Sequence, residues 1–178
     1  MLDWMVEVMS SYSFQHKTYF AGAELMDRFF ANSVEVLLPT QLHIIGVQSM
    51  FVATKMEEVY PLKMKTIYDK IAHKKIPIAE LVDMEKRIVE TLNFELTSST
   101  FYDLAMVRIV KQLTRKGLYT SEAIKDIEEV CACLAKFMLY NYTLICSFKK
   151  EVLADTLCNL TLEIYKYDKV KTSSDREE

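Results

Sequence analysis

Two oppositely charged residues, Lys55 and Glu85, lie in apolar patterns that suit helices, which makes them candidates for binding a partner. Lys55 follows Val52 by three positions and Glu85 follows Val82 by three, and residues at this spacing are neighbours on a helix. Each charge could then bind the polar end of a docked helix whose apolar side is buried. Two solvated charges with buried stems are the alternative, which periodicity alone favours.

The residues that usually carry catalysis are scattered. His16, His43 and His73 have no acid, base and nucleophile grouped beside them. Glu57 and Glu58 are adjacent, and adjacent helix positions diverge by about 100°, so a solvated helix end is a better interpretation than a catalytic pair. With only three glycines, the chain has no Gly-rich phosphate loop. We therefore expect that the protein is not an enzyme.

The four cysteines do not have the spacing of a metal site. Cys131 and Cys133 are two positions apart on a predicted helix, so they point to opposite sides, and Cys146 and Cys158 add no zinc spacing. We expect no metal and no cofactor. The first residues do not resemble a secretory signal, which suggests reduced thiols in the cytosol or nucleus.

Length and composition restrict the class of protein. The 178 residues allow one full domain or two small helical units, and 51% of them are hydrophobic, which is enough for a core. No apolar run approaches the ~20 residues that a membrane span needs. The formal net charge of -3 argues against a general nucleic-acid binder.

Helical periodicity dominates, and strand-like alternation is nowhere sustained, so we expect an all-α fold. The segment 42–61 (LHIIGVQSMFVATKMEEVYP) is apolar nearly all the way round and should form a helix buried on several sides, with Pro61 as a stop signal. Thr18 and Thr100 are predicted N-caps, the latter in a capping box with Asp103. The other predicted helices span about 1–12, 18–30, 62–71, 78–92, 100–113, 120–140 and 149–167.

A polar run at 97–99 divides the predicted helices into five before it and three after it. We expect a first lobe at 1–96 and a second at 97–170. Residues 171–178 (KTSSDREE) contain no apolar side chain and are predicted to form a disordered tail.

Four ordered motifs in the first half resemble the cyclin box. They are LDWMVEV at 2–8, LMDRFF at 25–30, the helix at 42–61, and Met84-Glu85 followed by LNFEL at 92–96. The wording is most similar to the mitotic, A- and B-type branch. The second half resembles the second cyclin box only in pattern, and it has room for about three helices where the family has five. The resemblance implies a cyclin fold with two helical lobes, the first a cyclin box and the second shortened.

The sequence departs from the family in two respects. His43 stands where the family has a glutamine, and the arginine that in the family pairs with the aspartate at Asp27 has no counterpart here. Independently of the resemblance, Asp27 and Arg28 are predicted to be structural, as an ion pair at a helix end.

The resemblance implies two contact surfaces. Cyclins contact their kinase with a Lys and a Glu in these two places, which reverses the preference for solvated charges. The implied kinase-binding residues are Lys55, Glu85, Val52, Met56, Glu57, Val89, Phe94 and Leu96. A substrate-docking patch for Arg-x-Leu motifs would consist of Trp4, Glu7, Leu42 and His43. A buried Trp4 that fixes the first helix to the third is the competing interpretation.

These observations lead us to expect a regulatory subunit that binds and activates a cyclin-dependent serine/threonine kinase in cell-cycle control. The expected partners are that kinase, in a heterodimer, and Arg-x-Leu substrates or inhibitors, with no nucleic acid and no membrane. The nucleus and cytoplasm are the expected location. Two alternatives remain open: a helical adaptor, and a transcription-factor-type cyclin fold without kinase activation.

Overall fold

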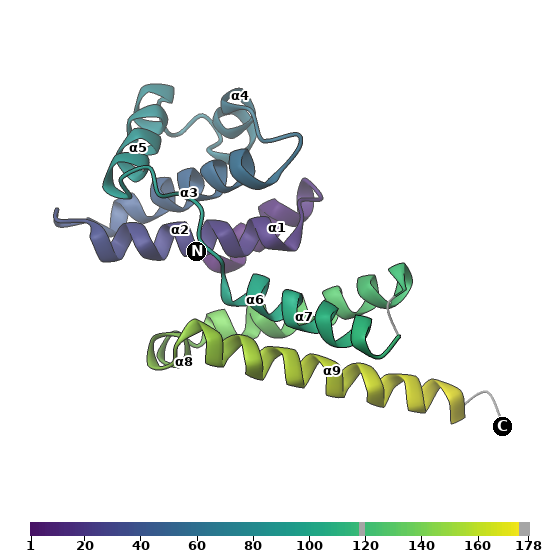
Figure 1. Cartoon of the computed structure of the whole chain (residues 1–178). Helices are drawn as coiled ribbons and strands as arrows, with labels where there is room; N and C mark the ends of the chain where they lie inside the picture. Colours follow the sequence, from purple (N-terminus) through teal and green to yellow (C-terminus); the bar gives the residue numbers. More distant parts are fainter. Residues whose placement is uncertain (118–119, 175–178) are drawn as a thin grey trace. The chain divides into compact units, whose positions relative to one another are not determined.

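The computed structural model describes residues 1–117 and 120–174, with side chains up to residue 166 (Figure 1). All regular secondary structure in these ranges is helical, which confirms the all-α prediction. The chain divides into two compact units, Met1–Ser98 and Ser99–Glu178. The first contains α1 (Leu2–Ser11), α2 (His16–Asn32), η1 (Pro39–Gln41), α3 (Leu42–Glu57), α4 (Met64–Thr66), η2 (Ile67–Ile71) and α5 (Ile78–Thr91). The second contains α6 (Phe101–Arg115), α7 (Ser121–Tyr140), α8 (Tyr142–Ser147) and α9 (Lys150–Ser174).

Helix α3 is the centre of the first unit. It packs most extensively against α2 and also against α5 and α1, and Figure 1 shows it between α2 and α5. Ten consecutive residues, 45–54, are buried, as expected of a helix that is apolar nearly all round. The predicted burial of this helix on several sides is therefore confirmed.

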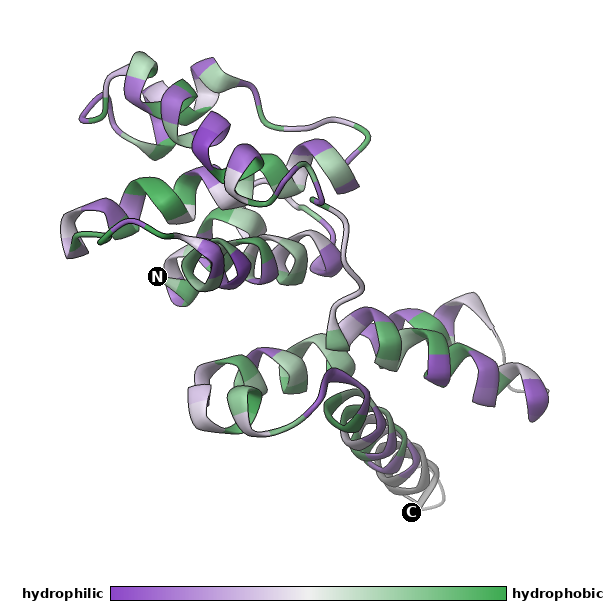
Figure 2. Ribbon diagram, turned by 60° about the vertical axis from the view of Figure 1, so that its left-hand side comes forward, coloured by the Kyte–Doolittle hydropathy of each residue, from purple (hydrophilic) through white to green (hydrophobic). Residues whose placement is uncertain are grey.

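The remaining long helices are amphipathic. Figure 2 shows apolar green and polar purple alternating along the ribbons of both units. Helix α5 turns Leu81, Met84 and Ile88 into the core, at the spacing of one helix face. In the second unit α9 packs against α6 and α7, around buried residues that include Ile109 and Leu157. Each unit thus has a core of its own.

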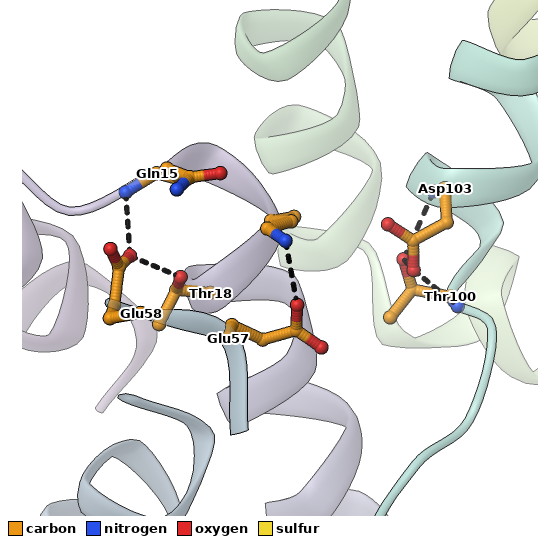
Figure 3. A network of polar contacts seen from close by, with 7 residues as sticks. Gln15, Thr18, Glu57, Glu58, Thr100 and Asp103 are labelled. Carbon is orange, nitrogen blue, oxygen red and sulfur yellow. Dashed lines mark hydrogen bonds and ion pairs between the residues drawn. The ribbon is translucent and has the colours of Figure 1, made fainter. Parts of the chain in front are cut away.

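The predicted capping box begins α6. The Asp103 amide donates to Thr100 Oγ1 (3.1 Å), while the Thr100 amide donates to Asp103 Oδ2 (2.9 Å), as Figure 3 shows. At the start of α7 the amide of Ala123 donates to the Thr120 hydroxyl (3.1 Å). These bonds satisfy backbone donors that a helix start leaves free.

Several element ends differ from the predictions. Helix α2 begins at His16, and Thr18 is buried inside its first turn instead of capping it. The segment predicted as one helix at 62–71 consists of the short α4 followed by a π-helical turn, η2. Helix α8 has only six residues and is preceded by Asn141 as its N-cap. It was not predicted because it is too short to show periodicity.

The last helix is longer than predicted. Helix α9 continues past residue 167 to Ser174, because no glycine or proline interrupts it. It therefore includes the first four residues of the predicted tail, and residues 175–178 lie outside the described residues.

Candidate partner-binding site

The two charges singled out by the sequence form an ion pair with each other. Lys55 Nζ, in the last turn of α3, lies 2.5 Å from Glu85 Oε1 of α5. The lysine side chain is 41% exposed and that of the glutamate 22%. Lys55 Nζ also lies 4.0 Å from the centroid of the Phe51 ring, a cation–π contact. The pair is therefore fixed at the surface and still accessible from solvent.

Exposed apolar side chains occur on the same two helices and just beyond α5. Met56 beside Lys55 is 45% exposed, Val82 one turn before Glu85 is 49% exposed, and Phe94 beyond the end of α5 is 74% exposed. We call Lys55, Glu85 and these three residues the paired-charge face. Val82 was absent from the residues implied by the resemblance, although its spacing to Glu85 marked it.

The other implied kinase contacts are less accessible. Val52 belongs to the core with 3% exposure, whereas Val89 and Leu96 are half-buried. Val52 would therefore support the face from beneath.

Phe94 is held in a backbone conformation that bulky residues rarely adopt. Its φ is 61°, and that of Asn93 is 50°, both in the left-handed region. The Phe94 amide donates to the Val89 carbonyl (3.0 Å), and Arg28 Nη2 of α2 donates to the Glu95 carbonyl (2.6 Å). These bonds fix a strained turn whose aromatic side chain faces solvent, and backbone strain of this kind clusters at functional sites.

Asp27 and Arg28 do not form the predicted ion pair with each other among the residues that the structure describes. Neighbouring positions on a helix point about 100° apart, which separates the two side chains. Arg28 instead binds the backbone at Glu95. Burial, and then the charge of Glu24, raise the pKa of Asp27 above its usual value.

The end of α3 is tied to the start of α2. Glu58 accepts hydrogen bonds from the Gln15 amide (2.9 Å) and the Thr18 hydroxyl (2.5 Å), as Figure 3 shows. Glu57 forms an ion pair with Lys17 (2.9 Å). The prediction of a merely solvated helix end is therefore wrong, because both carboxylates have partners on α2. Glu57 can take part in binding a partner only in addition to, or in exchange for, this ion pair.

The residues of the expected docking patch lie on α1 and at the start of α3. The rings of Trp4 and His43 are 4.9 Å apart and tilted by 60°. Trp4 is half-buried, as the interpretation of a residue fixing α1 to α3 requires, while Glu7 and Leu42 are exposed. Burial lowers the pKa of His43 below its usual value, and nearby Lys75 and His73 lower it further.

The described residues contain neither a cluster of metal ligands nor a helix suited to cross a membrane. Groups of three or more potential metal ligands are absent from the described side chains, those of residues 1–117 and 120–166. Cys131 is buried and Cys133 exposed, so they do point to opposite sides of α7. Within those ranges, no helix combines the length and apolar character needed to cross a membrane.

Comparisons with known proteins, by family model and by individual relatives, agree on one family. The model of the family described as "Cyclin, N-terminal domain" matches residues 1–97. A G1/S-specific cyclin-E1 of Danio rerio is 34% identical over 100 residues, which cover 56% of this chain and 24% of that protein. A G2/mitotic-specific cyclin-B of Dictyostelium discoideum is 31% identical over 105 residues, covering 56% and 22%. Cyclin-B1-1 of Arabidopsis thaliana is 24% identical over 154 residues, covering 86% and 33%.

The same relatives show how much of a cyclin this chain spans and which branches of the family it matches. The chain spans about a quarter of the length of the first relatives that it matches. G1/S and mitotic cyclins match at similar identity, so the similarity does not single out the mitotic branch that the wording of the motifs suggested.

Proposed function

The chain belongs to the cyclin family, and we propose that it is a regulatory subunit that binds and activates a cyclin-dependent serine/threonine kinase in cell-cycle control. The observation that carries this proposal is the paired-charge face, an accessible ion pair with exposed apolar side chains on the same two helices and just beyond α5. Interfaces are typically built from an apolar centre with a few placed charges.

The ion pair keeps the capacity to bind a partner. A lysine ammonium has three N–H donors, and Lys55 directs one of them at Glu85 Oε1. Besides these contacts with Glu85 and the Phe51 ring, Lys55 keeps donor capacity, and the second oxygen of Glu85 is available, for the carbonyl and amide groups at a helix end. Because each charge already has a partner, docking does not bury an unpaired charge.

Activation would follow from a population shift. A kinase needs the lysine–glutamate pair that orients ATP, and that pair forms only when the helix bearing the glutamate is in its inward position. A subunit that binds the inward position better shifts the equilibrium by its difference in affinity. Lys55 and Glu85 would fix the register of the docked helix, while Met56, Val82 and Phe94 would supply apolar burial.

The proposal is tested by adding the chain to a purified cyclin-dependent kinase and measuring binding and peptide phosphorylation. We expect Phe94→Ala to weaken binding by roughly tenfold, since exposed aromatic residues are common hot spots of interfaces. The control is Val107→Ala, which removes a similarly exposed apolar side chain (66%) from α6. Failure of the wild-type chain to bind any such kinase would contradict the proposal and favour a helical adaptor.

The docking patch is a second part of the proposal. We infer that Trp4, Glu7, Leu42 and His43 hold Arg-x-Leu motifs of substrates or inhibitors, supported by the contact between Trp4 and His43. Trp4→Ala should then reduce phosphorylation of substrates with this motif more than of substrates without it. A loss of stability with no such difference would leave Trp4 a packing residue only.

The nucleus and cytoplasm are the proposed location, as for any regulator of such a kinase.

A further inference from the structure

Positive charge is concentrated in the segment that leads from α4 through η2 to α5. Residues 63–75 contain five lysines and one aspartate, whereas the whole chain has a formal net charge of -3. Figure 1 shows α4 and α5 on the same side of α3. All five lysines of the segment are exposed. We call its last four basic residues, all exposed, the basic corner: Lys70, His73, Lys74 and Lys75.

The lysines of this segment lack the partners that the other cations of the first unit have. Of the five other lysines and arginines in Met1–Ser98, four form ion pairs with glutamates and one donates to a backbone carbonyl. Lys74 pairs only loosely with Asp69, with Nζ and Oδ1 3.8 Å apart. Among the described residues, no ion pair or side-chain hydrogen bond is made by Lys63, Lys65, Lys70 or Lys75. The segment therefore keeps a positive potential that attracts anions.

The turn that carries the basic corner is held in place. The φ of His73 is 48° and that of Lys74 is 58°, both in the left-handed region that side chains other than glycine rarely adopt. The Lys74 amide donates to the Tyr68 carbonyl (2.8 Å), and Ile71 and Ala72 are buried. Backbone strain of this kind clusters at functional sites. A fixed turn also loses less conformational entropy when a ligand binds.

The surroundings of the corner select a short ligand. Glu80 and Asp83 follow it on α5, are exposed, and have no ion pair among the residues that the structure describes. A long polyanion would meet these carboxylates, and proteins that bind nucleic acids are usually strongly basic, unlike this chain. A segment with only a few successive negative charges fits the corner better.

The basic corner lies at the opposite end of α3 from Lys55. Besides burial, which is the larger cause, the charges of Lys75 and His73 lower the pKa of His43, so both lie near the start of α3. Lys55 is in the last turn of this helix, roughly 18 Å further along it at 1.5 Å per residue. A ligand at the corner thus leaves the paired-charge face free.

We propose that the basic corner binds a short acidic segment of a partner protein, whose negative charge comes from phosphoserine or from successive Asp and Glu side chains. Each lysine ammonium offers three N–H donors, and a phosphate carries nearly two negative charges and three acceptor oxygens at pH 7. The ligand is opposite in sign to the arginine-containing motifs proposed for the docking patch. The proposal does not rest on kinase activation.

The test measures the affinity of two fluorescein-labelled peptides for the full chain by fluorescence anisotropy. Both have the sequence Gly-Glu-Ser-Glu-Glu-Gly, and in one of them the serine is phosphorylated. The triple variant Lys70→Glu, Lys74→Glu, Lys75→Glu should weaken binding about tenfold or more, as for the loss of three surface charge contacts. Raising the salt concentration should weaken the wild-type complex more than that of this variant.

A matched control separates the corner from the field of the whole molecule. The triple variant Lys111→Glu, Lys125→Glu, Lys149→Glu changes three exposed lysines of the second unit and reaches the same net charge. It should keep the affinity of the wild type within about twofold, because screening limits the reach of surface charges to about 10 Å. Equal losses in the two triple variants would overturn the proposal.

Two further variants test folding and the place of binding. Replacing the three corner lysines with glutamine removes their charge without reversing it, so this variant should keep the circular dichroism of the wild type and still bind more weakly. Trp4→Ala should leave the affinity unchanged. Loss of binding in Trp4→Ala, with none in the corner variants, would overturn the proposal in favour of the docking patch.

The two peptides identify the source of the charge. Tighter binding of the phosphorylated peptide would assign the corner to phosphoserine, and equal affinities would assign it to Asp and Glu side chains. A short oligothymidylate that binds more tightly than both peptides, and is released by the corner variant, would overturn the proposal in favour of a nucleic acid. An absence of peptide binding by the wild type would overturn it as well, whatever the outcome with a kinase.

Discussion

Lys55 and Glu85 contribute little to the stability of the first unit, although they lie only 2.5 Å apart. Ion pairs with this degree of exposure typically stabilise a protein by about 0–1 kcal/mol. Replacing either residue should therefore leave the fold intact, which makes the pair a direct probe of partner binding. Neither residue could have been paired from the sequence alone, because they are 30 positions apart and helical periodicity says nothing about which helices are neighbours.

His43 should make stability depend on pH. Its pKa in the folded chain lies below the unfolded value of 6.5, so the unfolded chain takes up a proton first as pH falls. Stability is therefore unaffected well above pH 6.5 and is lost as pH falls from there toward the folded pKa. The midpoint of thermal unfolding should drop between about pH 7.5 and about pH 5.5, and less so in His43→Gln.

The glutamine variant is a close control because it keeps a polar side chain of similar reach beside Trp4. Equal pH slopes in the wild type and in His43→Gln would show that His43 protonates as easily in the folded chain as in the unfolded one.

The four thiols should differ in reactivity. Burial raises the pKa of Cys131 to about 12 and also raises that of Cys158, whereas Cys133 and Cys146 are exposed. Only a thiolate is alkylated efficiently. Brief treatment of the native chain with iodoacetamide at neutral pH should modify Cys133 and Cys146 and spare the other two, as measured by peptide mass spectrometry. Rapid native labelling of Cys131 would mean that the core between α7 and α9 opens readily.

At the scale of elements, the bond between the end of α3 and the start of α2 should matter more than the ion pair beside it. Glu58→Ala would leave the Gln15 amide and the fully buried Thr18 hydroxyl without their acceptor. That loss should reduce the free energy of unfolding by about 1–3 kcal/mol. Glu57→Ala removes a partly exposed ion pair with Lys17 and should cost about 0–1 kcal/mol.

Urea unfolding of the two variants makes the comparison. Equal losses, or a larger loss for Glu57→Ala, would contradict the role assigned to Glu58. Glu57 is the last residue of α3 and Glu58 is its C-cap with an extended backbone, so neither substitution lies in the helix interior.

The elements that sequence predicted well are those determined locally. The helix at 42–57 follows from a segment that is apolar nearly all the way round, and the start of α6 follows from Thr100 and Asp103, three positions apart. Thr18 was taken for a cap because its type suits that position, but its actual partner, Glu58, lies 40 residues away. The strained turn at Phe94 was equally hidden, since its support comes from Arg28 on another helix.

At the scale of the whole molecule, the family assignment and the structure divide the chain at nearly the same place. The cyclin model covers residues 1–97, and the first compact unit is Met1–Ser98. All residues of the paired-charge face lie in this unit. The resemblance carried the functional prediction for this half, because motif spacing is preserved there, while the second unit was predictable only as a helical array.

The central claim is that Lys55 and Glu85 bind a cyclin-dependent kinase, and the most direct test is the affinity of such a kinase for Lys55→Glu, Glu85→Lys and the double variant. Each single reversal should weaken binding by about thirtyfold or more, as for the loss of a buried polar contact of about 2 kcal/mol. The double variant restores the internal ion pair with reversed polarity, so its circular dichroism and melting should match the wild type while kinase binding stays lost. Wild-type affinity in the double variant, or in both single variants, would contradict the account.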